Sequence, residues 1–407
     1  MFNFTSIDKY GLIVFRLGIF LLASAPFISS ILFLFSLIVT FLTKWKDFFK
    51  DKWNFLFIAA SILMLLISLL HLLKFENFSI SIPVSIESGE GKIAEWTPYS
   101  SLIGLSNWLP LFLSFWGFQP YLKSNKDREI IGKLLIAGSI PVLISGFGQY
   151  WFQWYGPMQT LNGLIIWFQR DVGGQLTSLF SNQNYAGCWF NIIWPFSIAL
   201  FFDKTKNLFK QGSSLIFLIS IGLSSLLTTS RNALLGLILT IPLILGTSTL
   251  YWLIPLFILF GILIFLKMLN INSGYFGAII DSLLPLPIFD RLTVGSNAGA
   301  EYSNRSTLFL FALQKITERP LIGFGAASFP LYYFLKDNYY MGHAHNLILD
   351  TAFSYGLIVT LLIFSNIFIL LFLTIKQIYF SKYIEKSNNL FFERAWFTSF
   401  LVLLFSQ

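Results

Sequence analysis

The feature that most constrains this chain is a series of nearly uncharged apolar stretches, each long enough to cross a bilayer. A span of about 30 Å of hydrocarbon requires roughly 20 helical residues. Such stretches lie at residues 12–43, 55–73, 101–122, 134–152, 186–202, 213–229, 233–247, 249–269, 346–375 and from 395 onward. Because backbone polar groups in lipid must pair within the structure, we expect an all-α, polytopic transmembrane helical bundle of about 10–12 helices.

Composition excludes an ordinary soluble fold. Hydrophobic residues make up 56% of the 407 residues and charged residues only 11%, whereas charged residues are about 25% of an average soluble domain. The single cysteine, Cys188, allows no intrachain disulfide. We therefore expect residues 1–407 to form one integral membrane domain.

The formal charge of +8 is explained by membrane topology, so no nucleic-acid partner is expected. Short loops rich in Lys and Arg stay in the cytoplasm. Loops with three or four positive residues each lie at 44–53, 123–133, 203–212 and 376–394. Alternation then places the remaining connections outside, at 74–100, 153–185, 230–232 and 270–345, the last being a large loop.

Two parts of this topology stay open at the level of sequence. Residues 12–43 are too long for one straight span, so they form either one tilted helix or a tight hairpin that breaks between Ala25 and Pro26. The hairpin would place the N-terminus inside, and the single span would place it outside. The final residues, 395–407, are too few to span a bilayer, so we expect either a truncated chain or a short or re-entrant helix.

Arg231 lies between two apolar runs, in the sequence TTSRNALLG. An Arg at the bilayer centre costs about 2.5–3.5 kcal/mol on insertion scales, so we expect it at the outer interface. There it either snorkels to water or binds an anion at a helix–helix turn.

Residues 303–319 of the large loop predict an amphipathic helix, with Ser303 or Asn304 as its cap and Pro320 after its end. Arg305 would lie in the first turn, where a cation opposes the helix macrodipole. It is either a plain surface residue or part of a phosphate site with the free N–H groups. The expected apolar face comprises Leu308, Phe309, Ala312, Leu313 and Ile316.

His343 and His345 stand immediately before the apolar stretch 346–375, with Asn346 beside them. Two histidines separated by one residue, without nearby cysteines, are poor metal spacing, so we predict no metal. They are either interfacial residues at a helix start or include a general base, since imidazole titrates near neutrality. Asp350, one turn further on, would orient a histidine or pair with an arginine.

A polar run also precedes the stretch 186–202. It is either a helix cap or a set of amides that hydrogen-bond sugar hydroxyls or phosphate. Arg170 and Asp171 lie nearby in the sequence and are expected to form a local ion pair. The run consists of Ser181, Asn182, Gln183 and Asn184.

Four segments between residues 180 and 362 together resemble the O-antigen ligase and polymerase family. They occur in the order found in that family, and one departure is Asn232, where the family usually has Gly. Asn tolerates the left-handed conformation that Gly supplies. The segments are FSNQNYAG (180–187), TTSRNALLG (228–236), residues 304–329 and residues 343–362.

The resemblance implies a glycosyltransferase with an undecaprenyl-diphosphate-linked glycan as donor. It would face the periplasm from the bacterial inner membrane and would need no metal or other cofactor. By motif, Arg231 and Arg305 hold the diphosphate, and His345 activates the acceptor hydroxyl for an inverting displacement. Candidate supporting residues are His343, Asn346, Asp350, Asn184 and Arg170.

Several alternatives stay open within and beyond this class. The acceptor is lipid A core for a ligase or another glycan repeat for a polymerase, and a protein O-oligosaccharyltransferase is a further variant. Outside the class, a transporter of a small anion such as bicarbonate, or a polysaccharide-export component, would also span the membrane and contact its lipids. A transporter predicts ionisable residues near mid-membrane, whereas here the polar groups gather at the outer face, which favours the enzyme.

Overall fold

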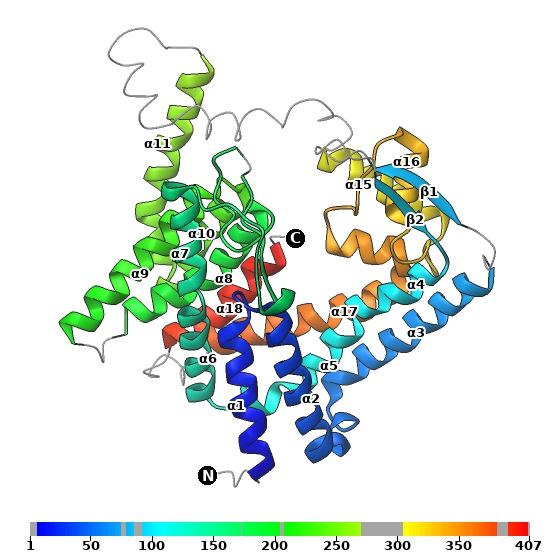
Figure 1. Ribbon diagram of the computed structural model, residues 1–407, viewed down its shortest axis with the longest axis horizontal. Helices are drawn as coiled ribbons and strands as arrows, with labels where there is room; N and C mark the ends of the chain where they lie inside the picture. The colour runs from blue at the N-terminus through cyan, green and yellow to red at the C-terminus, as the bar shows by residue number, and fades with distance from the viewer. Residues whose placement is uncertain are drawn as a thin grey trace. The chain divides into compact units, whose positions relative to one another are not determined.

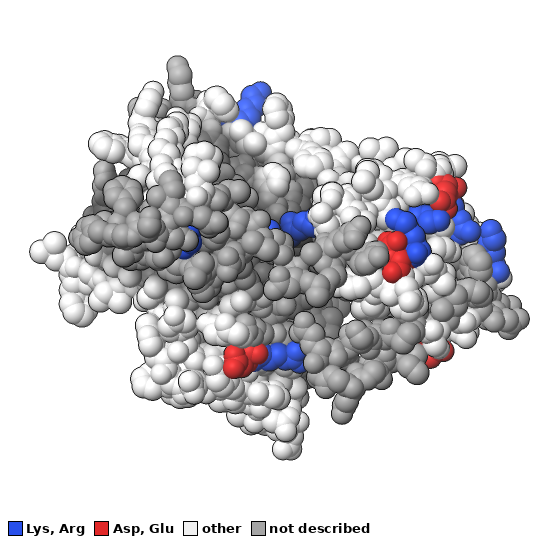
Figure 2. Space-filling view, turned by 90° about the horizontal axis from the view of Figure 1, so that it is seen from above, with Lys and Arg blue, Asp and Glu red and all other residues white. Residues whose placement is uncertain are grey.

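The structure is a computed structural model that describes residues 6–74, 79–84, 92–171, 173–203, 207–269, 304–380 and 390–405. These residues are mostly helical, which confirms the predicted helical membrane bundle, and the chain is a multi-pass membrane protein (Figure 1). Figure 2 shows one face, on which the described side chains are predominantly uncharged. Among the described residues, six segments are long and apolar enough to cross a membrane: Pro26–Phe48, Lys52–Lys74, Asn125–Phe152, Leu208–Leu227, Thr247–Lys267 and Leu347–Phe380.

The chain forms two compact units, and the first comprises residues 1–39, 120–295 and 377–406. Residues 270–303, which include much of the predicted large loop, lie outside the described part. The elements of the first unit are α1 (Ser6–Leu21), the start of α2 (Pro26–Phe48), α6 (Asn125–Gly138), α7 (Ile140–Phe152), β3 (Met158–Thr160), β4 (Ile165–Trp167), α8 (Gln183–Phe201), α9 (Leu208–Leu227), α10 (Arg231–Leu245), α11 (Leu250–Met268) and α18 (Leu390–Phe405).

The first apolar stretch is the hairpin alternative. α2 begins at Pro26, which has no N–H to continue a helix from the preceding residues. The hydroxyl of Ser29 donates to the carbonyl of Gly18 at 2.8 Å, and the ring centroids of Phe15 and Phe33 are 5.8 Å apart. α1 and α2 therefore run antiparallel, which places the N-terminus on the same side as the end of α2.

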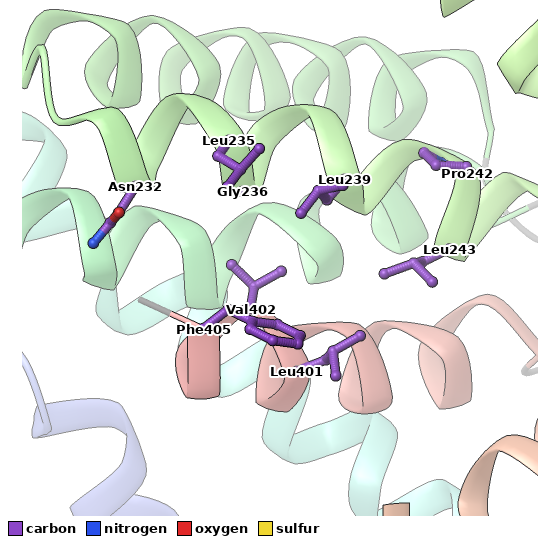
Figure 3. Close-up of a pocket in the computed structure, with 9 residues that line it drawn as sticks. All are labelled: Asn232, Leu235, Gly236, Leu239, Pro242, Leu243, Leu401, Val402 and Phe405. Atoms are coloured by element: carbon purple, nitrogen blue, oxygen red, sulfur yellow. The ribbon is translucent and has the colours of Figure 1, made fainter. Parts of the chain in front are cut away.

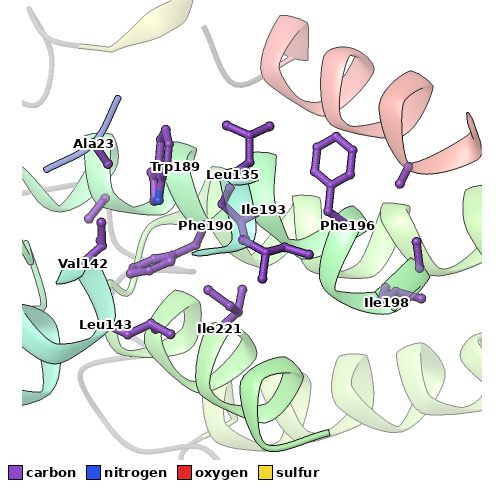
Figure 4. Packing of buried hydrophobic residues seen from close by; sticks show 14 of the residues in the cluster. Ala23, Leu135, Val142, Leu143, Trp189, Phe190, Ile193, Phe196, Ile198 and Ile221 are labelled. Carbon is purple, nitrogen blue, oxygen red and sulfur yellow. The ribbon is translucent and has the colours of Figure 1, made fainter. Parts of the chain in front are cut away.

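α8 lies at the centre of the first unit and packs against α6, α9, α10 and α18. The Asn182 side chain caps this helix by accepting a hydrogen bond from the Asn184 N–H at 2.7 Å. A helix that is apolar on every face belongs inside a bundle. Its fully buried apolar side chains include Phe190, Ile193 and Phe196 (Figure 4), together with Ala186 and Ala199.

Ion pairs join the helices of this unit around the first turn of α6. Arg128 contacts Glu393 of α18, with 2.9 Å between Nη2 and Oε1. Arg16 of α1 contacts Asp127 at 3.0 Å. A charge within or near a spanning segment is costly unless it is paired. These contacts therefore explain how α1, α6 and α18 carry charged residues near the first turn of α6.

The second unit comprises residues 40–119 and 296–376, with residue 407. β1 and β2 pair antiparallel with Ile80 opposite Trp96. Residues 101–122, predicted as one span, instead contain two short helices separated by a 3₁₀ turn at Gly104–Asn107. The elements of this unit are the end of α2, α3 (Lys52–Lys74), β1 (Ile80–Val84), β2 (Lys92–Trp96), α4 (Tyr99–Ile103), α5 (Leu109–Gly117), α15 (Arg305–Glu318), α16 (Phe329–Asp337) and most of α17 (Leu347–Phe380).

α17 is interrupted at Gly356, which has a φ of 83° and a ψ of 172°. A break of this kind removes the intrahelical partners of the carbonyls that precede it. The carbonyl of Phe353 instead accepts from the N–H of Phe324 at 2.8 Å, and that of Ser354 accepts from Gly325 at 3.0 Å. The connection between α15 and α16 therefore fills the break and is held against α17 by backbone hydrogen bonds.

Substitution of Gly323, which lies in the segment between α15 and α16, should lower the stability of the protein. Its φ is 61°, and a Cβ there would lie 2.5 Å from the carbonyl oxygen of Phe353. Gly323→Ala should cost about 1–2 kcal/mol for the left-handed conformation alone, and the steric conflict adds to this. The apparent Tm in detergent should fall, whereas Gly261→Ala within α11, where nothing lies within 4 Å, should leave it unchanged or raise it, because Ala favours a helix more than Gly does. Equal Tm values for the two variants would contradict this packing.

Candidate functional site

The first group of candidate residues begins at the N-terminus of α15. Arg305 is the first residue of the helix, and it is exposed. Asn304 is the cap, because its side-chain oxygen accepts a hydrogen bond from the N–H of Ser306 at 3.2 Å. The predicted helix start is therefore confirmed, and Arg305 lies in the first turn of the helix.

The buried face of α15 determines the orientation of the helix and so of its first turn. Phe311, which was absent from the predicted face, packs edge-on against Phe329 and Tyr333 of α16. Leu313 is 49% exposed, so its predicted place on that face is wrong. Residues three and four positions apart share one face of a helix. The face that contains Leu308 therefore includes positions 311 and 312, and position 313 lies at its edge. The buried residues are Leu308, Phe311, Ala312 and Ile316.

His345 lies two residues before α17 in a left-handed conformation, with a φ of 53°. Its Nε2 is 3.3 Å from the sulfur of Met341, and its ring centroid is 4.2 Å from that of His343. A thioether sulfur can only accept a hydrogen bond. This contact assigns the proton of the neutral ring to Nε2 and leaves the lone pair on Nδ1.

The surroundings of His345 keep it uncharged. The pKa of His345 is lowered to about 4, mainly by burial and also by the charges of His343 and Arg305. The positive charge of Arg305 therefore acts on the imidazole of His345 and favours its neutral form. A neutral imidazole beside a cation can accept a proton while the cation holds an anion.

Asn346 and Asp350 hold the backbone around the histidines. The side-chain oxygen of Asn346 accepts from the N–H groups of Ile348 and Leu349 at 3.1 and 3.0 Å, which caps α17. A carboxylate oxygen of Asp350 accepts from the Ala344 N–H at 3.4 Å. Asp350 therefore fixes the backbone between the two histidines, whereas the sequence suggested a direct contact with a side chain.

The second group surrounds the N-termini of α8 and α10. Arg231 is exposed and is the first residue of α10, immediately after the short turn that follows α9. A Cβ on Gly187 of α8 would lie 2.8 Å from the Cβ of Ala233 and 3.1 Å from that of Ser230. The close approach at Gly187 brings the N-terminal ends of two helices together beside Arg231. Both ends carry partial positive charge.

Arg170 and Asn184 lie in the same unit. Asn184 is exposed in the first turn of α8, and Arg170 is exposed while its carbonyl accepts from the Gln149 side chain at 2.6 Å. Asp171 was expected to pair with Arg170. Its carboxylate instead accepts from the N–H of Gly173 at 3.1 Å, and among the described residues no ion pair joins Asp171 to Arg170.

The candidate residues thus fall into two groups. One lies in the first unit and consists of Arg231, Arg170 and Asn184. The other lies in the second unit and consists of Arg305, His343, His345, Asn346 and Asp350. The single site that would combine both groups stays a prediction.

Two residues near the second group were missed by the sequence analysis. Met341 carries no signal in the sequence, because its contact with His345 depends on the backbone turn between them. His71 is buried in the last turn of α3, with 2.8 Å between its Nδ1 and the Ile67 carbonyl. A Cβ on Gly325 would lie 3.4 Å from its ring. An ionisable residue in a spanning helix is a functional candidate by default, and that signal would have identified His71.

Comparison with known proteins gives a family match that covers part of the chain. Residues 215–364 match the family model described as O-Antigen ligase. No curated protein matches the chain. The matched segment runs from α9 into α17, so it contains Arg231, Arg305 and His345. Over residues 215–364, the chain is therefore similar to the O-antigen ligase family.

Proposed function

We propose that the protein transfers an undecaprenyl-diphosphate-linked glycan to an acceptor hydroxyl at the periplasmic face of the bacterial inner membrane. The observation that carries this proposal is the neutral imidazole of His345 in the electrostatic environment of Arg305, within the segment that matches the family. The arrangement supplies a proton acceptor and an anion-binding helix N-terminus. These are the two groups that displacement of a diphosphate requires.

The two arginines are suited to hold the diphosphate. Arg305 and Arg231 are each the first residue of a helix. The N–H groups of the first turn have no intrahelical partner, and a guanidinium offers bidentate hydrogen bonds to phosphate oxygens. Two such helix starts would stabilise the charge that develops on the leaving diphosphate without a divalent cation.

His345 would act on the acceptor. Its Nδ1 takes the proton of the acceptor hydroxyl, and the oxygen attacks the anomeric carbon of the donor sugar. The bond between that carbon and the diphosphate oxygen breaks, and the electron pair leaves with the diphosphate. Attack from the side opposite the leaving group inverts the anomeric configuration, and positioning both reactants in one site supplies much of the rate enhancement.

The lowered pKa of His345 predicts the pH dependence of transfer. A base whose pKa is about 4 stays unprotonated from neutrality down to about pH 5, since the ratio of base to acid changes tenfold per pH unit. kcat/KM for the purified protein should therefore be constant from pH 7 to pH 5 and should decline only as the pH passes through about 4. A decline centred near 6.5, the usual pKa of histidine, would contradict this assignment.

Single replacements test the proposed function in cells. Arg231→Ala, Arg305→Ala and His345→Ala should each abolish the normal pattern of surface polysaccharide on a gel, with each protein present in the membrane. The pattern that the variants leave also separates the acceptors, because loss of long chains alone indicates a polymerase and loss of all glycan from lipid A core indicates a ligase. An unchanged pattern from all three variants would refute the proposal. Uptake of a small anion by reconstituted protein would instead support a transporter.

A further inference from the structure

An apolar β-hairpin follows the last turn of α7 in the first unit. It comprises residues 153–168 and contains β3 and β4, which pair antiparallel with Met158 opposite Trp167. From residue 134 to residue 169 the chain has no charged side chain. Leu161, at the tip of the hairpin, is 63% exposed. The other exposed apolar residues of the hairpin are Trp154, Tyr155, Met158, Leu164, Ile166 and Phe168.

The hairpin begins by folding back on α7. One face of α7 is exposed through Ile140, Ile144 and Trp151, and α7 belongs to a candidate membrane span, so this face meets lipid. Gly148 lies on the same face, because residues three and four positions apart adjoin on a helix. The ring of Trp154 covers Gly148, where an added Cβ would overlap it. The surface of the hairpin is therefore continuous with the lipid-facing surface of a spanning helix.

A second contact places the hairpin at the level of a helix end. The indole N–H of Trp167 donates to the carbonyl of Ser24 at 2.7 Å, and Ser24 lies in the short connection between α1 and α2. α2 is itself a candidate span, so its first residues lie where the chain leaves the hydrocarbon. The hairpin therefore lies beside the boundary of the bilayer and not at its centre.

Composition and backbone both favour the membrane–water interface for this hairpin. Trp and Tyr are enriched there because each joins an apolar ring to a polar group, and the hairpin carries Trp154, Tyr155 and Trp167. By contrast, the apolar groove between α10 and α18 is lined by Asn232 and by Leu, Val, Pro, Gly and Phe residues (Figure 3), a composition suited to hydrocarbon. A two-stranded sheet also has two open edges, which do not occur within the hydrocarbon region.

We propose that residues 153–168 insert into the membrane–water interface beside α7, with Leu161 and Leu164 among the upper acyl chains of the adjoining leaflet. The partner of this surface is the lipid of the bilayer. Continuity with the lipid-facing side of α7 favours lipid over a saccharide or a second copy of the chain, because the bilayer that surrounds α7 also covers the hairpin. The hairpin is thus a lipid anchor that does not cross the membrane.

Insertion of the hairpin also sets the depth of the loop that carries Arg170. The N–H of Gly156 donates to the Gln169 carbonyl at 2.8 Å, which ties the base of the hairpin to this loop. The N–H of Arg170 donates to the Thr177 hydroxyl at 3.2 Å, and its side chain is exposed. An exposed guanidinium two residues beyond an interfacial segment lies at the level of the lipid phosphate groups.

Quenching by nitroxide lipids measures the depth of the hairpin. Leu161→Cys, in a Cys188→Ser background, carries an environment-sensitive fluorophore in nanodiscs of phosphatidylcholine and phosphatidylglycerol that hold one copy of the protein each. The nitroxide is placed on the lipid head group, near the top of the acyl chain or near its end. The matched controls are Leu239→Cys in the middle of α10 and Lys126→Cys, which replaces an exposed charge.

The label at Leu161 should be quenched most by the nitroxide near the top of the acyl chain, because interfacial elements bury their apolar face about 5–10 Å into the boundary of head groups and acyl chains. Leu164→Cys should give the same result from a second position. The label at Leu239 should respond most to the nitroxide at the chain end, and that at Lys126 only to the head-group nitroxide.

Two outcomes would overturn the proposal. A label at Leu161 with the quenching profile of Lys126 would place the hairpin in water, and one with the profile of Leu239 would place it in hydrocarbon. With one copy in each nanodisc and no saccharide present, quenching by the lipid nitroxide identifies lipid as the partner. The measurement uses neither donor nor acceptor, so its result is independent of whether the protein transfers a glycan.

Discussion

Replacing His345 with Gln should reduce glycan transfer by about 10²–10⁴-fold, which is the usual contribution of a positioned general base. Gln keeps a side-chain N–H that can reach Met341 but has no basic lone pair at physiological pH. The loss should therefore appear in kcat for a saturating donor, while donor binding changes little. The measurement is the rate of product formation by purified protein, with its membrane level and oligomeric profile matched to the wild type.

His343→Gln is the comparison that identifies which histidine is the base. Its ring centroid lies 4.2 Å from that of His345, and its charge lowers the pKa of His345. His343→Gln should retain most of the transfer rate. The pH at which kcat/KM declines in acid should rise from about 4, because one cause of the lowered pKa of His345 is gone. A large loss in His343→Gln together with a near-normal rate in His345→Gln would reverse the assignment.

Removing the Arg305 guanidinium should lower kcat/KM by about 10²–10³-fold, the magnitude seen when one donor to a developing anion is lost. Arg305→Lys should recover part of this, because it keeps the charge and loses the bidentate geometry. Arg305→Ala should also raise the pKa of His345, since the charge of Arg305 lowers it. If Arg305 only stabilised the helix, its replacement would not change the pH at which kcat/KM declines in acid.

The same reasoning gives a test of whether the two groups of residues form one site. Arg231→Ala and Arg305→Ala should be strongly non-additive in the double variant if both guanidiniums hold one diphosphate. Lys46→Ala and Lys210→Ala each remove an exposed positive charge from loops predicted to face the cytoplasm, and they should leave kcat/KM unchanged. Fully additive effects would indicate that the two arginines act at separate sites.

Hydropathy and capping rules were sufficient for much of the fold. α3, α8, α9 and α10 lie within a few residues of the predicted spans, because a 20-residue apolar run in lipid has few alternatives to a helix. The start of α15 followed from its two predicted caps, Ser303 and Asn304, and the structure shows that Asn304 caps it. The position of Arg305 in the first turn followed from the same signal, without any knowledge of tertiary structure.

The remaining features depend on contacts between distant residues. The run 346–375 reads as one continuous helix, and only the hydrogen bonds from Phe324 and Gly325 to the carbonyls of Phe353 and Ser354 explain its interruption. The tautomer of His345 likewise depends on a sulfur placed by a left-handed backbone turn. Local propensity carries no information on either, so neither was accessible from the sequence.

Glycan transfer by the purified protein, with a chelator present, tests the central claim most directly. The protein would be supplied with a polyprenyl-diphosphate-linked glycan and, separately, with lipid A core or a second copy of the donor as acceptor. Mass spectrometry and NMR of the products should show a glycoside of inverted anomeric configuration and free polyprenyl diphosphate, formed by wild-type protein and at least about 10²-fold more slowly by His345→Gln. Transfer that continues at the wild-type rate in His345→Gln, or a product of retained configuration, would contradict the account.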